Sequence, residues 1–232
     1  MIPAGGSLSD PATPAAAEGG EMDRLDWTGG TQRGETLERG AAAAFMRRLA
    51  DLPEGSDPAA GLAQVLEAMA IDRRVENRVF AATLLALAGT YDVAADLLCA
   101  EAAGRRLEGK QWAALEAAVV PMALARGEAS ADRLRRAWED RGPPGRATLI
   151  DLMARRPTDA ELESGADRAI VEALSDGALV VRRYAFACLD AIVGPAPADR
   201  ARYRPDAAED ARRDGAAWWR TQQERGLVRR SP

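Results

Sequence analysis

Residues 180–194 read VVRRYAFACLDAIVG, and residues 75–89 read VENRVFAATLLALAG. With the two stretches aligned at a shift of 105 positions, Val, Arg, Ala, Leu, Ala and Gly coincide. This shift equals three periods of about 35 residues, the size of a helix-turn-helix unit in proteins built from stacked helical repeats. We therefore predict an all-α fold, an irregular solenoid of about ten helices in which neighbouring units bury each other's apolar faces.

The composition favours a folded helical protein. The chain has 232 residues, of which 47% are hydrophobic and only 5% aromatic, so we expect an interior of Ala, Leu and Val. A net charge of −5 opposes a broad nucleic-acid-binding surface. The sequence has no signal-peptide pattern and no run of roughly 18 apolar residues that could span a membrane. We expect a cytoplasmic protein that binds no nucleic acid.

Turn-forming residues divide the chain into three parts. Residues 1–33 are rich in Pro, Ala and Gly and predict a disordered arm, in which Trp27 stands out. Residues 34–194 are expected to form helical repeats, and residues 195–232 a connecting segment and a C-terminal capping helix. Apolar periodicity predicts helices over 36–52, 57 onward, 75–88, 92–103, 110–126, 130–141, 146–156, 158–175 and 180 onward.

Three of these helices have recognisable start signals. Asp57 stands before a proline, as an N-cap residue does. Thr158 and Glu161 have the spacing of a capping box, in which each side chain bonds the backbone N–H of the other residue. Asp206 and Glu209 repeat that spacing, so we expect the last helix to begin near Asp206.

The duplicated helix has one apolar stripe. In the second copy the stripe consists of Val181, Tyr184, Ala185, Cys188, Leu189 and Ile192. The equivalent positions in the first copy are Glu76, Val79, Phe80, Thr83, Leu84 and Leu87. We predict that both stripes face the same layer of a stacked core and fill the same role in different units.

The second copy resembles the HEAT repeat. VRRYAFACL at residues 181–189 fits that family's Val-Arg-x-x-Ala-x-x-Ala-Leu pattern, and Asp176 matches the Asp of the preceding turn. The first copy departs from the pattern at its first two positions, and the units between the copies do not match it. In HEAT-like arrays this neighbourhood often braces adjacent units, so the resemblance implies a structural role for Arg78 and Arg183 first and partner contact second.

A longer resemblance covers about two fifths of the chain, from residue 131 onward. The phrases ADRLRRAWEDRG, LIDLMARRPTDAELESGADRAIVEALSDG and RYRPDAAEDARRDGAAWW look like the C-terminal helical region of planctomycete FecR-type regulatory proteins of unknown activity. In those proteins an upstream region carries a membrane segment and a FecR domain. The resemblance implies a regulatory tail in an anti-sigma or envelope-signalling system, and a periplasmic location within a larger membrane-anchored protein as the alternative.

Residues for catalysis are sparse. Without histidine, Ser-His-Asp and Cys-His arrangements and most zinc sites are excluded. Cys99 and Cys188 lie in apolar helical contexts and are expected to be buried hydrophobes. Asp151 and Asp190 could act as acid or base only if they are buried, and we expect Asp190 to face solvent or pair with an arginine. We predict no catalytic residue, cofactor or metal.

These observations favour a non-enzymatic scaffold that binds a protein or peptide. The candidate partner-contact residues are Arg78, Arg182, Arg183, Trp218 and Trp219, although the adjacent tryptophans are first interpreted as a cap on the last repeat. A DNA glycosylase of the AlkD type, which is built on HEAT-like repeats, is a further alternative. Its nearest candidate residues would be Trp112, Trp138 and Asp151. The oligomeric state stays open.

Overall fold

The computed structural model describes residues 39–194 and 202–230, and it contains helices but no strand in these ranges. The all-α prediction is therefore confirmed. The predicted arm over 1–33, with Trp27, and the first part of the connecting segment, 195–201, lie outside the described residues.

The helices follow one another along the chain. A helix over 39–50 is followed by α2 (Pro58–Ala70), α3 (Val75–Leu87), α4 (Asp92–Cys99), α5 (Gly109–Ala125), α6 (Glu128–Arg141), α7 (Ala147–Ala154), α8 (Asp159–Glu161), a π-helical turn (Leu162–Ala166), α9 (Asp167–Ala173), α10 (Leu179–Val193) and α12 (Glu209–Glu224).

Local capping signals predicted two helix starts correctly. The Asp57 carboxylate accepts hydrogen bonds from the N–H groups of the second and third residues after it, both at 3.3 Å, and α2 begins at the next residue. The Thr158 N–H donates to Glu161 Oε2 at 2.8 Å, and the Glu161 N–H donates to the Thr158 hydroxyl at 3.4 Å. Both bonds are made within a few residues, so the sequence alone specifies them.

Two predicted helices differ from the structure for tertiary or steric reasons. The helix expected over 92–103 ends at Cys99, and the Glu101 carboxylate beyond it accepts a 2.9 Å hydrogen bond from the N–H of Leu179 at the start of α10. The helix expected over 158–175 is interrupted at Gly165, whose φ of 111° is far from helical values. The chain thus forms α8, a π-helical turn and α9 where one helix was predicted.

The last helix begins later than its sequence suggested. It starts at Glu209, and the residue before it, Ala208, provides no side-chain cap. The capping box predicted for Asp206 is therefore wrong, because Asp206 precedes the helix by three residues and lies at the edge of a pocket that also contains α10 residues.

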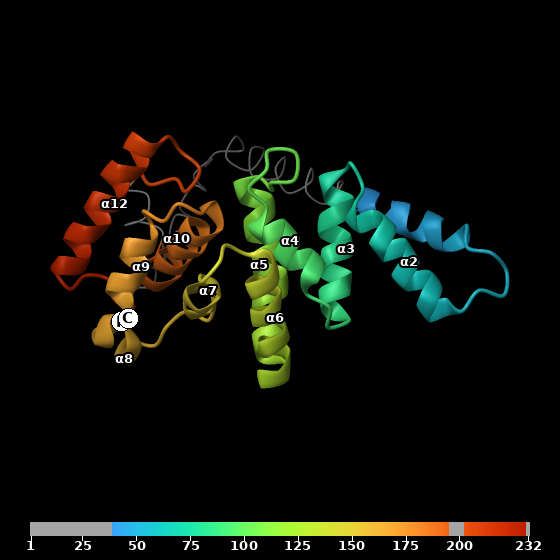
Figure 1. The fold of residues 1–232 in the computed structure, drawn as a ribbon, viewed down its shortest axis with the longest axis horizontal. Coiled ribbons are helices and arrows are strands. Elements are labelled where there is room, and N and C mark those ends of the chain that lie inside the picture. The colour runs from blue at the N-terminus through green and yellow to red at the C-terminus, as the bar shows by residue number, and fades with distance from the viewer. Residues whose placement is uncertain (1–38, 195–201, 231–232) are drawn as a thin grey trace, which may run out of the picture. The chain divides into compact units, whose positions relative to one another are not determined.

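Helices within residues 41–232 contact mainly the next element or the one after it. α2 packs on α3, α3 contacts both α4 and α5, and α4 contacts α6. Farther along the chain α7 contacts α10, α9 contacts α12, and α9 and α10 contact each other; Figure 1 shows α9 beside α12. One longer connection joins α10 to α4.

The two copies of the duplicated stretch lie in different environments. In α10 the whole predicted stripe is buried, from Val181 to Ile192. In α3 the corresponding positions are only partly buried, and Leu87 is 48% exposed. The buried residues of α3 are Asn77, Ala81, Ala82 and Ala86. The prediction of equivalent stripes is therefore wrong for the first copy, because α3 buries its small residues fully while Phe80 and Leu84 pack only partly buried against the cluster that α2 contributes.

The turns before the two helices are alike. Asp72 and Asp176 each stand three residues before a helix, and each accepts a hydrogen bond from the N–H two residues on, at 3.0 and 2.8 Å. The helices themselves begin at Val75 and Leu179. The two helices thus begin 104 residues apart, whereas the identical residues align at a shift of 105. Identical residues therefore stand one position apart in the two helices, so their side chains point in different directions.

Candidate functional site

A pocket of about 290 Å³ lies between α5, α10 and the segment that leads into α12. Its walls are mostly apolar, and three charged side chains lie among its lining residues. The lining consists of Gly109, Trp112 and Ala113 of α5, Arg183, Phe186, Ala187 and Asp190 of α10, and Pro205 and Asp206. The volume is at the small end of the range for ligand sites, so the pocket fits a single side chain better than a drug-sized molecule.

Arg183 is the buried cation of this pocket. Its Nη2 donates a 2.8 Å hydrogen bond to the carbonyl of Leu107, and its guanidinium carbon lies 5.7 Å from the centre of the Trp112 ring. These contacts hold the guanidinium against the aromatic face, as a cation–π interaction does. Burial lowers the pKa of Arg183, and the carboxylate of Asp206 opposes that shift.

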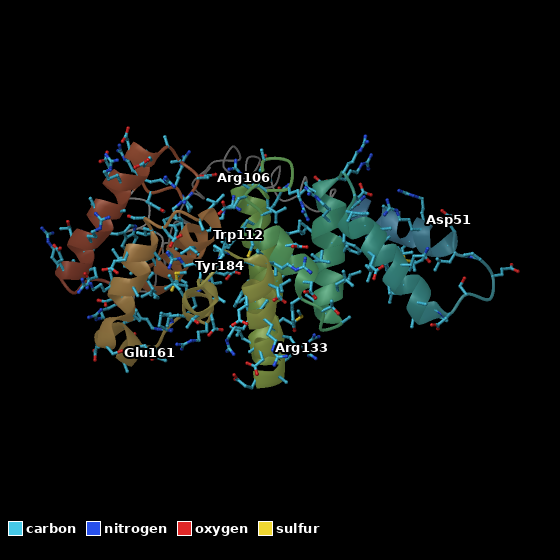
Figure 2. The ribbon with its side chains drawn as sticks, in the orientation of Figure 1. Asp51, Arg106, Trp112, Arg133, Glu161 and Tyr184 are labelled. Carbon is cyan, nitrogen blue, oxygen red and sulfur yellow. The ribbon has the colours of Figure 1, made fainter. Side chains whose placement is uncertain are left out.

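The floor below the pocket is an aromatic cluster. Tyr184, next to Arg183 in α10, is fully buried and meets Trp112 edge-on at a ring-centre distance of 5.0 Å and Trp138 at 5.7 Å. Figure 2 shows Trp112 and Tyr184 close to one another. Edge-to-face aromatic pairs of this kind add to the free energy of burial. They link α5, α6 and α10 and fix the position of the pocket wall.

A buried ion pair also joins α5 to the end of α7. Glu116 is 6% exposed and accepts a 3.0 Å hydrogen bond from Arg156, which also donates to the carbonyl of Met153. Burial raises the pKa of Glu116, although the positive charge of Arg156 opposes this. Because both groups are engaged within the protein, we interpret this pair as structural.

The predicted partner-contact arginines have unequal surroundings. Arg182 is buried, and it donates to the carbonyls of Asp176, Gly177 and Pro205 at 2.6 to 2.9 Å. Arg182 and Arg183 thus brace backbone carbonyls, which agrees with the structural role expected first for Arg183. Arg78 differs from them, since its Nε is buried without a hydrogen-bond partner among the described residues.

The tryptophan pair packs as a cap. Trp219 is fully buried in α12, whereas Trp218 is half-buried, and their rings meet at 87° with centres 5.1 Å apart. α12 packs on α9, and Val228 beyond α12 is also fully buried. These contacts agree with the interpretation of the pair as a cover for the preceding helices.

The glycosylase candidates do not present a common surface. Trp138 is fully buried and Trp112 is 3% exposed, so neither ring is free to contact a base. Asp151 lies 3.6 Å from Arg135, to which it is ion-paired. Asp190 is exposed, as predicted.

Both cysteines are buried, as predicted. Neither forms a disulfide, and burial raises the pKa of the Cys99 and Cys188 thiols to about 12. Such thiols remain protonated and unreactive at neutral pH.

Within the ranges that the structure describes, no group of three or more acidic or Cys side chains is arranged to hold a metal ion.

Two pocket residues, Phe186 and Asp206, show why the sequence analysis did not find this site. Phe186 lies off the buried stripe of α10, and an aromatic residue in that position is itself a signal of a further apolar contact. Asp206 was assigned to a helix cap and not to a site. Its meeting with α10 depends on the path of the chain between the two helices, which no local pattern specifies.

Comparisons with protein-family models, with curated proteins and with solved structures give no significant match. The HEAT-like and FecR-type resemblances therefore rest on the residues quoted for them. In the described part of the chain, no helix is both long and apolar enough to cross a membrane.

Proposed function

We propose that this protein is a non-enzymatic interaction module of HEAT-like type that binds a peptide segment of a partner protein. The order of helix contacts supports the repeat architecture. α3 contacts α5 while α4 contacts α6, and α7 contacts α10 while α9 contacts α12. In stacked two-helix units, the first helices of adjacent units pack together and so do the second helices. The intervening α8 and its π-helical turn make the array irregular.

The observation that carries the proposal is the pocket between α5 and α10. Its wall residues are fixed by the Tyr184 cluster and by the bond from Arg183 to the Leu107 carbonyl, so the cavity exists before a ligand arrives. A preformed apolar pocket of this size suits one anchor residue of a peptide, and a few such anchors dominate the free energy of most interfaces. We place this interaction in the cytoplasm.

Selection from a phage-displayed library of random dodecapeptides tests the proposal. Enriched peptides are synthesised with a fluorescent label, and their Kd values are measured by fluorescence anisotropy against wild type and two variants. Ala113→Leu fills the pocket from an exposed position of α5, and Ala114→Leu adds the same group at an exposed position outside it. We expect Ala113→Leu to weaken binding at least tenfold and Ala114→Leu to leave it unchanged. Failure to enrich any binder, or equal binding to both variants, would refute the proposal.

The two alternatives are less well supported. A regulatory tail of FecR type would use the same binding surface, and a sigma-factor gene beside this one would favour it. The glycosylase alternative has lost its candidate residues, because Trp138 is fully buried and Asp151 is paired with Arg135.

A further inference from the structure

The pocket combines an apolar interior with an acidic rim. Trp112, Phe186, Ala187 and Pro205 provide apolar wall, and Asp190 and Asp206 are exposed side chains that line the same cavity. The two carboxylates come from different elements, α10 and the segment before α12. Tertiary structure therefore places two negative charges beside one apolar opening.

Two carboxylates and one guanidinium line the described part of the pocket, and Arg106 and Arg182 lie near enough to Arg183 to lower its pKa. Neither Asp190 nor Asp206 forms an ion pair with another described residue, whereas carboxylates such as Asp176 and Glu161 do. Among the described lining residues Arg183 is the only cation, and its guanidinium is already held by the Leu107 carbonyl and the Trp112 ring. The rim thus presents two exposed carboxylates to an incoming ligand, of which Asp206 also acts electrostatically on Arg183.

The position of Arg183 decides where a ligand cation can lie. A second cation inserted deep into the pocket would be desolvated beside a buried guanidinium, which is costly. An apolar side chain meets no such cost there and gains free energy by covering the partly exposed Phe186 and Pro205. A cation at the rim stays partly hydrated and gains from two carboxylates.

We propose that the pocket binds a peptide segment in which an aliphatic residue enters the cavity and a flanking Arg or Lys pairs with Asp190 and Asp206. This inference rests on the proposed function and specifies the chemistry of its ligand. A basic–aliphatic segment matches both the interior and the rim, whereas an acidic segment would meet like charge at the opening.

Four labelled peptides test this assignment, each with Gly-Ser flanks and a core of Arg-Leu-Arg, Arg-Ser-Arg, Glu-Leu-Glu or Ser-Leu-Ser. Their Kd values are measured by fluorescence anisotropy at fixed salt. Loss of the leucine should weaken binding about tenfold or more, because a buried leucine side chain contributes substantially to affinity. Replacing the arginines by serines should weaken binding about threefold to tenfold, as exposed ion pairs are individually weak. The Glu-Leu-Glu peptide should bind most weakly.

Variants locate the effect on the protein. The double change Asp190→Asn and Asp206→Asn should reduce the preference for Arg-Leu-Arg over Ser-Leu-Ser to less than twofold. Asp214→Asn, an exposed carboxylate of α12 outside the pocket, is the matched control and should preserve the preference. Circular dichroism verifies that each variant is folded.

The outcomes separate the two proposals. If library-derived peptides bind and Ala113→Leu abolishes their binding, but charge at positions 190 and 206 has no effect, the basic–aliphatic assignment is wrong and the binding module stands. The same conclusion follows if the four synthetic peptides do not bind while library-derived ones do. If no peptide binds by either route, both proposals fail.

Discussion

Replacement of Arg182 by methionine should destabilise the protein strongly. Arg182 links the turn before α10 to the segment before α12, since its Nη1 donates to the carbonyls of Asp176 and Gly177 and its Nε donates to that of Pro205. Methionine keeps most of the apolar stem but none of the donors. The substitution therefore leaves three partly buried carbonyls without their partner.

The expected loss follows from these bonds. A hydrogen bond from a charged donor contributes about 1.5 kcal/mol at the lower end of the usual range, so three such bonds contribute about 4.5 kcal/mol. Burial lowers the pKa of Arg182, which shows that the guanidinium is desolvated at a cost. Removal of that cost offsets part of this loss. The free energy of unfolding should therefore fall by about 3 kcal/mol, which corresponds to about 6–12 °C in Tm for a chain of this size.

Urea and thermal unfolding followed by circular dichroism at 222 nm would measure this change. Arg213→Met is the matched control, because Arg213 is exposed on α12 and its ion pairs within the described residues are with Glu209 and Asp210 of its own helix. Its loss should cost less than about 0.5 kcal/mol. If Arg182→Met and Arg213→Met have the same Tm, the bracing role assigned to Arg182 is refuted.

Three further changes have defined consequences. Gly215→Ala should lower the free energy of unfolding by about 1–3 kcal/mol, as measured by chemical denaturation. The new Cβ would lie 2.8 Å from Cβ and 3.0 Å from Cα of Tyr203, and a backbone atom at that distance cannot move aside as the end of a flexible side chain could. Cys99 and Cys188 should react with a thiol reagent at pH 8 only after unfolding. Their folded pKa of about 12 exceeds the ordinary 9.0, so their contribution to stability is present below pH 9 and declines as pH rises toward 12. Glu161→Gln should flatten the loss of stability in acid, because its bonds with Arg155 and Thr158 lower the pKa of Glu161 from 4.5 to about 2, and the contribution disappears as pH falls through that range.

Each of these expectations has a contrary result. Unchanged stability in Gly215→Ala would mean that the Tyr203 segment is not held against α12 as closely as the structure shows. Rapid labelling of either thiol in the folded protein would contradict the burial of that cysteine. Identical acid-unfolding curves for wild type and Glu161→Gln would show that the capping box contributes nothing in solution.

Helix starts were predictable where their cause was local. The cap at Asp57 and the box of Thr158 and Glu161 depend on atoms within three residues, so the sequence specifies them. The end of α4 was not predictable in this way. The chain leaves the helix after Cys99, and Glu101 then bonds the N–H of Leu179, a residue 78 positions away.

The candidate site was less predictable than the fold. Arg183 was singled out from the sequence because it coincides with Arg78, yet the two differ: Arg183 donates to the Leu107 carbonyl, whereas Nε of Arg78 is buried without a partner among the described residues. Asp206 had been assigned to a helix cap. Its place beside α10 is set by the path of the chain before α12, and the apolar periodicity of the sequence does not predict that path.

By itself the sequence determined an all-helical protein, the positions of most helices and the burial of both cysteines, because each follows from apolar periodicity and short-range hydrogen bonds. Tertiary structure decided which face of α3 is buried, whereas the buried stripe of α10 followed from its periodicity. The duplicated stretches share letters, but α10 packs its large apolar stripe inward whereas α3 packs Ala81, Ala82 and Ala86. Burial depends on how many neighbours surround a helix and at what rotation, and these are properties of the assembled chain. The pocket between α5 and α10 arises from the same cause.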